Sequence, residues 1–495
     1  MPALVDKLAG AGIYGDATQT PFRGEEDQRT MKADQLVQLT IAEAARSFQS
    51  GELSPVELTR ACLERIEAMD PKLNAFITLL PELAMAEARA AEQRLGRGER
   101  LGSLDGIPFA IKDLYETKGI RTTAGSKILA DYVPAEDATC IRRLREQGVV
   151  LLGKLNMHEW AFGATNVVSH FGPAHNPWGL DRITGGSSGG SGAALAASLC
   201  LGSLGSDTGG SIRMPASMCG IVGLKPTYGR VSKHGVVPLS GSLDHAGPMT
   251  RTVEDAALVL QAIAGPDPDD LTTEDVPVPD YPAALSGEVR GLRVGVPGGD
   301  ALSGLDKDVE TSFRATLKTL ESLGASLVEV HIPALQRAEA IWEAIAGPEA
   351  AAYHRRNLEE RPEDFSEPVR LRLQQGLQIR AVDYLRGLEG LQQLRAEVAQ
   401  QYAKIDVLVT PTTASTASRI EDELAASGRE VHIHRLTCPF NLTGQPAISV
   451  PCGFDSQGLP VGLQIVGRAF DEETVLRVAH AYEQATDWHK ARPNL

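Results

Sequence analysis

The sequence predicts an α/β fold, because apolar runs that are typical of buried strands alternate with helical segments. Residues 106–113 read Gly-Ile-Pro-Phe-Ala-Ile-Lys-Asp and predict a buried strand that ends at a lysine. A short amphipathic helix is predicted over 140–147, and the run Val-Val-Leu-Leu-Gly-Lys at 149–154 predicts the next strand. Helices that alternate with strands in this way are typical of α/β architecture.

The residues before the first of these strands predict an irregular arm followed by helices. Residues 1–33 are polar and interrupted by glycine and proline, and from residue 40 the composition becomes helical. The run Ser-Pro-Val-Glu at 54–57 is a strong helix start, with serine as N-cap, proline at the first helical position and glutamate closing a capping box. We expect this helix to stop at the Asp-Pro pair 70–71, and a second helix to cover 82–95.

The second half of the chain continues the alternation around a long helical stretch. Residues 334–401 are almost all helix formers, residues 266–286 predict a surface excursion, and residues 411–435 predict a mobile loop. The other predicted elements are helices over 252–264, 306–323 and 472–484, and strands over 292–296, 326–330, 405–410, 447–450 and 461–465.

Composition and charge exclude several classes of function. The chain has 495 residues, of which 42% are hydrophobic and 23% charged, as in ordinary globular proteins. Its net charge is −16 and no run of Lys or Arg is present, so we expect no nucleic-acid partner. Six scattered cysteines without C-x-x-C pairs predict small buried thiols in a reducing compartment. With no secretory signal and no run of 18 apolar residues, we expect no membrane association and a cytoplasmic location.

Two serine-bearing glycine turns suggest a serine-based active site. One reads Gly-Gly-Ser-Ser-Gly-Gly-Ser-Gly at 185–192, and the other reads Gly-Ser-Asp-Thr-Gly-Gly-Ser-Ile-Arg at 205–213. Glycine at this density costs backbone entropy, but it is useful where backbone N–H groups must crowd a ligand. We expect the alanine-rich segment between the turns to be a helix. The candidate nucleophiles are Ser187, Ser188, Ser191 and Ser211.

A serine hydroxyl needs a base to become nucleophilic, and Lys112 is the sharpest candidate. Lys112 ends an apolar strand, and desolvation there would lower the pKa of its amine so that a neutral lysine could act as base. The alternative for Lys112 is an ion pair with Asp113 or another acid. His158 is the histidine whose setting marks it out, although a lone histidine of this kind is more often structural.

The second turn has the pattern of an oxyanion hole. Successive backbone N–H groups of Thr208, Gly209, Gly210 and Ser211 can point into one concavity, where they would stabilise a tetrahedral oxyanion. The alternatives are an ordinary glycine turn or a phosphate cradle, and the missing Gly-Lys-Ser/Thr ending excludes a Walker loop. A Gly-x-Ser-x-Gly match would make Ser188 the nucleophile, but the strong apolar strand that this elbow needs does not precede it.

Taken together, these motifs resemble the amidase signature family over about residues 36–490. The resemblance implies one α/β domain at 36–495, with a large mixed, mostly parallel twisted sheet flanked by helices, preceded by an N-terminal arm at 1–35. The segments that carry it are 185–191, 207–213 and 219–232, supported by 106–113, 152–156, 171–173, 176–178, 446–453 and 458–467.

The resemblance also implies a Ser–cis-Ser–Lys triad. Matched by motif, Lys112 is the base, Ser187 the bridging serine after a cis peptide bond, and Ser211 the nucleophile that forms an acyl-enzyme. The intervals of 75 and 24 residues between them agree with the family's usual spacing. Thr208, Gly209 and Gly210 would form the oxyanion hole, and Ser188, Asp207 and Arg213 would hold the turns by hydrogen bonding. A small-molecule amide is the implied substrate, and no metal or other cofactor is expected.

The first half of the chain looks much like the amidase-type subunit of glutamyl-tRNA amidotransferase, and the second half departs from it. The Tyr-Leu-Ser-Asp type segment expected of that subunit is replaced by residues 432–444, which look more like free-standing amidases. We therefore predict a stand-alone amide hydrolase. The alternatives are the glutamine-hydrolysing subunit of a tRNA-dependent amidotransferase, a carbamate, urea-type or ester hydrolase, and a catalytically dead amide-binding protein.

Two segments that the motifs leave uncovered, 334–385 and 412–435, are expected to set substrate choice. They contain Trp342, Tyr353 and Tyr384, although such aromatic residues are more often core than pocket. The assembly we consider is a homodimer in which the N-terminal helices pack on a second copy of the chain.

Overall fold

The computed structural model describes residues 33–426 and 433–495. The predicted N-terminal arm at 1–35 therefore lies almost entirely outside the described residues, as do residues 427–432 of the predicted loop. None of the helices in these two described ranges is long and apolar enough to cross a membrane.

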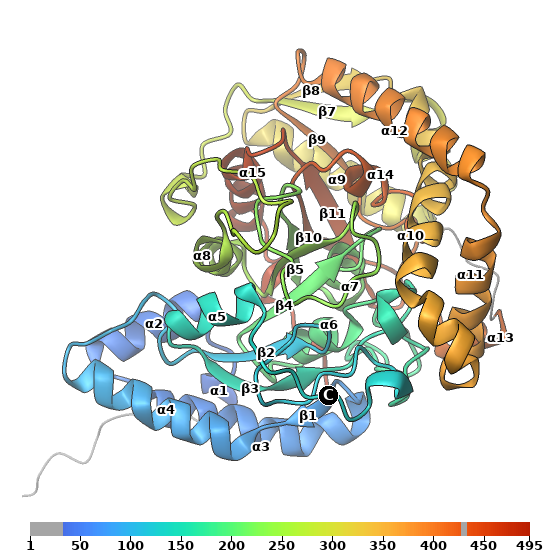
Figure 1. Ribbon diagram of the computed structural model, residues 1–495. Helices are drawn as coiled ribbons and strands as arrows, with labels where there is room; N and C mark the ends of the chain where they lie inside the picture. The colour runs from blue at the N-terminus through green and yellow to red at the C-terminus, as the bar shows by residue number, and fades with distance from the viewer. Residues whose placement is uncertain (1–32, 427–432) are drawn as a thin grey trace, which may run out of the picture. The chain divides into compact units, whose positions relative to one another are not determined.

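One sheet of eleven strands runs through the described chain in the order β1-β3-β2-β4-β6-β5-β10-β11-β9-β7-β8 (Figure 1). The strands are β1 (Phe76–Leu79), β2 (Pro108–Lys112), β3 (Val150–Leu155), β4 (Gly202–Asp207), β5 (Val222–Lys225), β6 (His245–Thr250), β7 (Arg293–Pro297), β8 (Ser326–Val330), β9 (Val407–Pro411), β10 (Ala447–Phe454) and β11 (Pro460–Val466).

Helices flank this sheet, which confirms the predicted α/β class. They are α1 (Ala33–Leu36), α2 (Ile41–Ser50), α3 (Pro55–Leu73), α4 (Pro81–Gly96), α5 (Thr139–Glu146), α6 (Gly189–Ala196), α7 (Arg213–Cys219), α8 (Val253–Ile263), α9 (Lys307–Ser322), α10 (Ala338–Glu360), α11 (Glu367–Gln378), α12 (Ala381–Gln401), α13 (Ile420–Ala425), α14 (Pro439–Leu442) and α15 (Glu472–Gln484). Helices α10, α11 and α12 lie together as a layer along one side of the molecule (Figure 1).

The sheet is mixed, as expected, but the expectation that it is mostly parallel is wrong. Four of the ten strand pairings in the described chain are parallel and six are antiparallel. Parallel neighbours such as β2 and β3, or β7 and β8, are separated in sequence by a helix, which the crossover between parallel strands requires. In contrast, β10 and β11 are joined by a tight turn at 455–459, and such a turn makes an antiparallel hairpin.

Local signals in the sequence predict the start of α3 correctly and its end incorrectly. Ser54 and Glu57 form the capping box, with the Ser54 side chain accepting from the backbone and Glu57 accepting from the Ser54 N–H. The helix then continues through Pro71 to Leu73 and ends at Asn74 in the left-handed region. Because Pro71 sits in the last turn, the hydrogen bond that it removes is a single one near the helix end.

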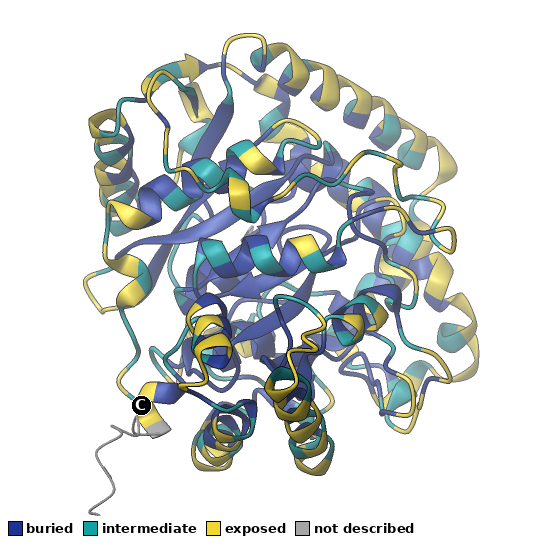
Figure 2. Ribbon diagram, turned by 90° about the vertical axis from the view of Figure 1, so that its left-hand side faces the viewer, coloured by how far each residue is buried: buried dark blue, intermediate teal, exposed yellow. Residues whose placement is uncertain are grey.

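Three strands near the site are made from sequences that do not look like strands. The segment between the two glycine turns contains not only the expected helix, α6, but also β4, which reads Gly-Ser-Leu-Gly-Ser-Asp. A Cβ atom at Gly202 would lie 2.3 Å from the ring of Phe109 on neighbouring β2, so this strand approaches its neighbour where only glycine fits. β5 and β6 also contain glycine and are fully buried. The burial pattern in Figure 2 shows buried strands between helices whose outer faces are exposed.

Candidate active site

Lys112, Ser187 and Ser188 come together where β2 and β4 end. Lys112 is the last residue of β2, and Ser206 and Asp207 are the last residues of β4. The two strands are parallel neighbours, so their carboxyl ends meet at the same edge of the sheet. Ser187 and Ser188 stand at the start of α6, which packs against both strands.

Lys112 is fully buried and surrounded by serine hydroxyls. Its Nζ donates to Ser187 Oγ at 2.7 Å, to Ser188 Oγ at 2.9 Å and to Ser206 Oγ at 2.7 Å. The alternative of an ion pair with Asp113 is wrong, because Asp113 pairs instead with Lys154 at 3.3 Å. Lys112 is therefore a buried amine held by three neutral hydroxyls.

This environment changes the protonation of Lys112. Burial lowers the pKa of the Lys112 amine well below its usual range, while the charges of Asp207 and Asp244 act in the opposite direction. Burial dominates because desolvation disfavours the charged form of an amine. A neutral lysine near neutral pH can accept a proton from a hydroxyl that contacts it.

The three candidate serines of the first glycine turn, Ser187, Ser188 and Ser191, have different partners. The peptide bond between Gly186 and Ser187 is cis, as the resemblance implied. Ser188 contacts Lys112 through its hydroxyl, and its backbone N–H donates to the carbonyl of Ser211 at 3.3 Å, so the two glycine turns lie against each other. Ser191 accepts a hydrogen bond from Ser203 at 3.0 Å and does not contact Lys112.

His158 is structural in its immediate contacts, as is usual for a lone histidine of this kind. Its Nδ1 accepts from the backbone N–H of Asn166, and its own backbone N–H donates to the carbonyl of Ser187. Burial lowers the pKa of His158 to about 3, so the ring stays neutral. It supports the backbone of Ser187 and offers no base to a serine hydroxyl.

Asp207 and Arg213 hold the second glycine turn from inside. Their side chains form a fully buried ion pair at 2.8 Å, and Asp207 Oδ2 also accepts from the backbone N–H groups of Ile212 and Arg213. Burial alone would raise the pKa of Asp207, but the Arg213 guanidinium beside it holds the pKa well below its usual range. The carboxylate therefore stays ionised and fixes both ends of the turn.

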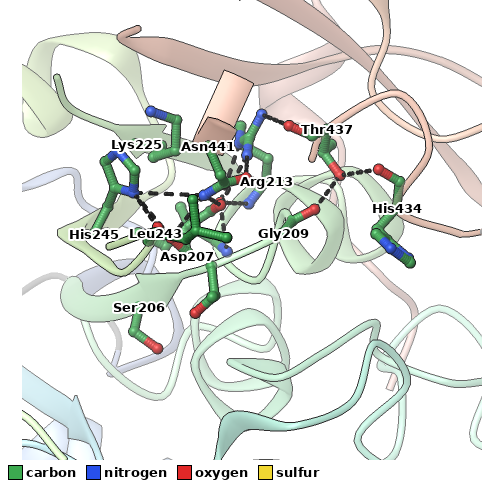
Figure 3. A network of polar contacts seen from close by, with 12 residues as sticks. Ser206, Asp207, Gly209, Arg213, Lys225, Leu243, His245, His434, Thr437 and Asn441 are labelled. Atoms are coloured by element: carbon green, nitrogen blue, oxygen red, sulfur yellow. Dashed lines mark hydrogen bonds and ion pairs between the residues drawn. The ribbon is translucent and has the colours of Figure 1, made fainter. Parts of the chain in front are cut away.

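Side chains from far along the sequence complete this network (Figure 3). Arg213 donates to Asn441 Oδ1 at 2.7 Å, to the carbonyl of Thr437 at 3.0 Å and to Gln464 Oε1 at 2.6 Å. Asn441 in turn donates to Asp207. The second glycine turn is thus held both by residues of its own segment and by residues from the C-terminal part of the chain.

The backbone of the second turn leaves a row of donors unused. The N–H groups of Thr208, Gly209, Gly210 and Ser211 donate to no acceptor within the described ranges. Their carbonyls are held: that of Thr208 accepts from Trp342 Nε1 at 2.8 Å, and that of Gly209 accepts from Thr437 Oγ1 at 2.6 Å. Gly210 has φ +134°, and a Cβ atom there would lie 2.2 Å from Thr437 Oγ1, so only glycine fits.

Ser211 opens onto a small pocket. A cavity of about 20 Å³ is lined by the second turn and by three side chains from the segments expected to set substrate choice, namely Trp342, Arg372 and His434. Arg372 donates to the carbonyl of Phe162 at 3.0 Å and lies over its ring, and Trp342 packs on His434. Tyr353, the second aromatic residue singled out, is half exposed on α10 and does not line this pocket.

A second cavity, of about 300 Å³, lies beside the first and reaches Ser206 and Thr208. Its polar lining includes Lys233, Asp244 and His245. Thr208 Oγ1 donates to Asp244 Oδ1 at 2.5 Å, and burial lowers the pKa of His245 well below its usual range.

Sequence reasoning missed Ser206, whose hydroxyl contacts Lys112, and it did not place Arg372 or His434 in a pocket. The position of Ser206 could have indicated its role, because it directly precedes Asp207 at the end of the strand beside Lys112. The other two come from distant helices and loops and carry no local pattern. Within the described residues, no group of three or more His, Cys, Asp or Glu side chains is placed to hold a metal ion.

The chain is similar to known proteins along nearly its whole length. A family model described as Amidase matches residues 57–476. The A component of glutamyl-tRNA(Gln) amidotransferase from Geobacter metallireducens is 44% identical over 485 residues, covering 93% of this chain and 100% of that protein.

Two solved structures show the same fold. One is described as an unexpected vestigial protein complex that reveals the evolutionary origins of an s-triazine catabolic enzyme; its TM-score is 0.87 at 35% identity, over 92% of this chain and 100% of that chain. The other is 6-aminohexanoate cyclic dimer hydrolase complexed with substrate, with a TM-score of 0.85 at 31% identity, over 92% of this chain and 99% of that chain. The similarity therefore concerns the complete fold and not one motif.

Proposed function

The chain belongs to the amidase family and is an amide hydrolase, and we propose that it works through Ser211, Ser187 and Lys112. Ser211 Oγ attacks the amide carbonyl while its proton passes to Ser187, whose own proton passes to the neutral amine of Lys112. Collapse of the tetrahedral intermediate returns the proton through Ser187 to the leaving nitrogen. Water then hydrolyses the acyl-enzyme by the same proton route.

The observation that carries this proposal is the contact between Lys112 and Ser187. The 2.7 Å distance from Nζ to Oγ allows direct proton transfer, and burial has already lowered the pKa of the amine that must accept. The hydrogen bond from the Ser188 N–H to the Ser211 carbonyl keeps the nucleophile's turn against the turn that bears Ser187. Both supports are independent of the family resemblance.

The unused N–H groups of the second turn supply the oxyanion site in this mechanism. Thr208, Gly209 and Gly210 direct no N–H to another described residue, and the carbonyls of the first two are fixed by Trp342 and Thr437. Donors that are already fixed need no reorganisation when negative charge develops, and one such donor is worth about 3–4 kcal/mol of barrier. Ser188, Asp207 and Arg213 act by holding these turns.

For the substrate, the first candidate is a small carboxamide whose acyl group is neutral or acidic. The pocket beside Ser211 is lined by one cationic side chain, Arg372, and by no carboxylate of the described residues. Within the part of this wall that the structure describes, the ammonium group of a free amino acid would find no counter-ion. His434 contributes to this wall from the segment where the sequence departs from the amidotransferase subunit.

The second candidate is hydrolysis of glutamine as one subunit of a tRNA-dependent amidotransferase. The full-length similarity to a component of such an enzyme favours this second candidate over the stand-alone amidase predicted from the sequence. A protein or tRNA partner belongs to this candidate. The net charge of −16 supports the first candidate, because tRNA binding by this chain alone would need a basic surface.

The test is a panel of substrates given to the purified full chain without partners. We expect turnover of an aryl amide such as a p-nitroanilide, and loss of at least about 10³-fold in Ser211→Ala. Parallel assays with glutamine, a carbamate and an ester separate the other hydrolytic candidates. Preference for glutamine, increased by a partner protein, would establish the second candidate.

A fluorophosphonate probe separates an enzyme from a catalytically dead amide-binding protein. We expect the probe to label the wild-type chain and to leave Ser211→Ala unlabelled. Equal labelling and equal turnover in the two chains would overturn Ser211 as nucleophile. The matched control is Ser191→Ala, which removes another buried serine that contacts Ser203 instead of Lys112.

A further inference from the structure

Lys112 contacts two hydroxyls that the proposed proton route does not use. As an ammonium it has three N–H donors, and three serines accept them: Ser187, Ser188 and Ser206. As a neutral amine it keeps two N–H donors and one lone pair. Proton transfer requires the lone pair to face Ser187, so the two remaining hydrogens need the other two hydroxyls.

Ser188 and Ser206 are not equivalent in this role. The Ser188 hydroxyl is tied to the backbone of residue 206, since it accepts from the Ser206 N–H and donates to the Ser206 carbonyl, both at 3.3 Å. Ser206 Oγ has no such tie. Its side chain points away from the Asp207–Arg213 cluster, as alternation along β4 requires (Figure 3), and it lies on the wall of the 300 Å³ cavity.

We propose that Ser206 is a positioning residue for Lys112, and this inference rests on the proposed function. Its hydroxyl accepts the second N–H of the neutral amine and thereby aims the lone pair at Ser187. In this proposal the Ser206 hydroxyl turns its own hydrogen toward the cavity that Asp244 and His245 also line, which leaves its oxygen free to accept from Lys112.

The surrounding charges do not replace this contact. Asp207 at the end of β4 and Asp244 before β6 act on Lys112 through their charges, and His158 after β3 is a third titratable group near it, whose ring stays neutral. All three remain in place when the Ser206 hydroxyl is removed. A change in the protonation of Lys112 after that substitution therefore reports the hydroxyl itself.

The test measures the rate of fluorophosphonate labelling against pH in the full chain, for wild type, Ser206→Ala and Ser206→Thr. In Ser206→Ala the ammonium loses one of three acceptors, so we expect the acid limb to move to lower pH by about one unit. The plateau rate should fall about tenfold, because the lone pair is no longer aimed. Ser206→Thr keeps the hydroxyl and should restore both values.

Ser203→Ala is the matched control, because Ser203 is a buried serine on the same strand that contacts Ser191. Ser206→Cys keeps the volume of the side chain but has a weaker acceptor, so it should move the acid limb in the same direction by a smaller amount. This variant keeps the proposal testable if Ser206→Ala does not fold. An unmoved limb in a folded Ser206 variant, or an equal shift in Ser203→Ala, would overturn the proposal. Absence of labelling in the wild type would instead overturn the proposed function, so the two failures are distinguishable.

Discussion

The second glycine turn and the helical layer α10–α12 both contain ion pairs, but they use them differently. Asp207 and Arg213 are fully buried, 2.8 Å apart, and bonded to the backbone of the turn that carries Ser211. Arg355 and Glu359 on α10 form a pair at 3.0 Å with side chains 73% and 63% exposed. The first pair determines where backbone donors point, while the second lies on the solvent face of a helix that would form without it.

The two regions meet at Trp342, which lies on α10 and donates to the carbonyl of Thr208 in the turn. The inner face of the helical layer therefore contributes to the pocket, and its outer face does not. In the proposed mechanism, chemistry and selectivity come from different parts of the chain: the edge of the sheet carries the reacting groups, and the helices cover them.

The largest effect should come from Asp207→Asn. Removing the charge leaves the Arg213 guanidinium buried without its counter-ion, so we expect the free energy of unfolding to fall by about 3–5 kcal/mol. Denaturant unfolding measures this loss. Because the folded pKa of Asp207 lies below its unfolded value, the contribution is present above the unfolded pKa and is lost as the pH falls toward the folded pKa.

Asp406→Asn is the control for that substitution. Asp406 pairs with Arg293 at 2.7 Å in a partly exposed position, so its loss should cost about 1 kcal/mol or less. Equal losses in the two variants would show that burial of the Asp207–Arg213 pair has no special weight.

Glu483 extends the comparison to a buried carboxyl that contacts a backbone N–H and, among the described residues, no guanidinium. Glu483 on α15 accepts from the Val253 N–H, and burial raises the pKa of its carboxyl to about 8. The folded state therefore binds this proton more tightly than the unfolded state, so stability should decrease as the pH rises from about 5 to about 8. We expect Glu483→Gln to remove on the order of 3 kcal/mol of this dependence. Thermal unfolding at several pH values measures it, and a dependence equal to that of the wild type would contradict the assignment.

A smaller effect is expected where the two regions touch. Trp342→Phe keeps an aromatic ring but removes the donor to the Thr208 carbonyl, so the turn is held by one contact fewer. We expect kcat/KM to fall about tenfold, and the free energy of unfolding to fall by about 1 kcal/mol, the typical contribution of one neutral hydrogen bond. Tyr353→Phe on the outer part of the same helix is the control and should leave kcat/KM unchanged.

The smallest effect should come from the surface pair. Glu359→Gln removes an exposed i,i+4 interaction, and the expected change in the free energy of unfolding is below about 0.5 kcal/mol. Differential scanning calorimetry would detect a larger effect. A loss above about 1 kcal/mol would mean that the outer face of α10 is not a simple solvent face.

The sequence identifies the turn far better than the helices, and the reason is local geometry. Ser187, Ser211 and Lys112 sit beside glycines or at the end of an apolar strand, where backbone requirements leave a visible pattern. The helical stretch 334–401 is predictable only as helical, because its face toward the pocket is determined by what packs against it. Trp342 and Arg372 carry no signal that distinguishes a pocket residue from a core residue.

The same contrast explains the errors in the fold. β4 and β6 are glycine-containing strands in the centre of the sheet, where close approach to neighbours outweighs strand propensity. The expectation of a mostly parallel sheet is wrong because strand direction depends on which distant strands pair, and no local pattern shows this. Helix α3, in contrast, is predictable at its start because a capping box is a local device.

The clamp on the second turn has a consequence for the order in which the protein becomes active during synthesis. Arg213 is bonded to Gln464, 251 residues later in the chain. At typical translation rates of about 5–20 residues per second, roughly 10–50 s separate the appearance of these two residues. Lys112, Ser187 and Ser211 all leave the ribosome before Thr437, Asn441 and Gln464, which complete the network around the turn, have been synthesised. A nascent chain stalled before residue 437 should therefore hold all three residues of the proposed triad and hydrolyse nothing.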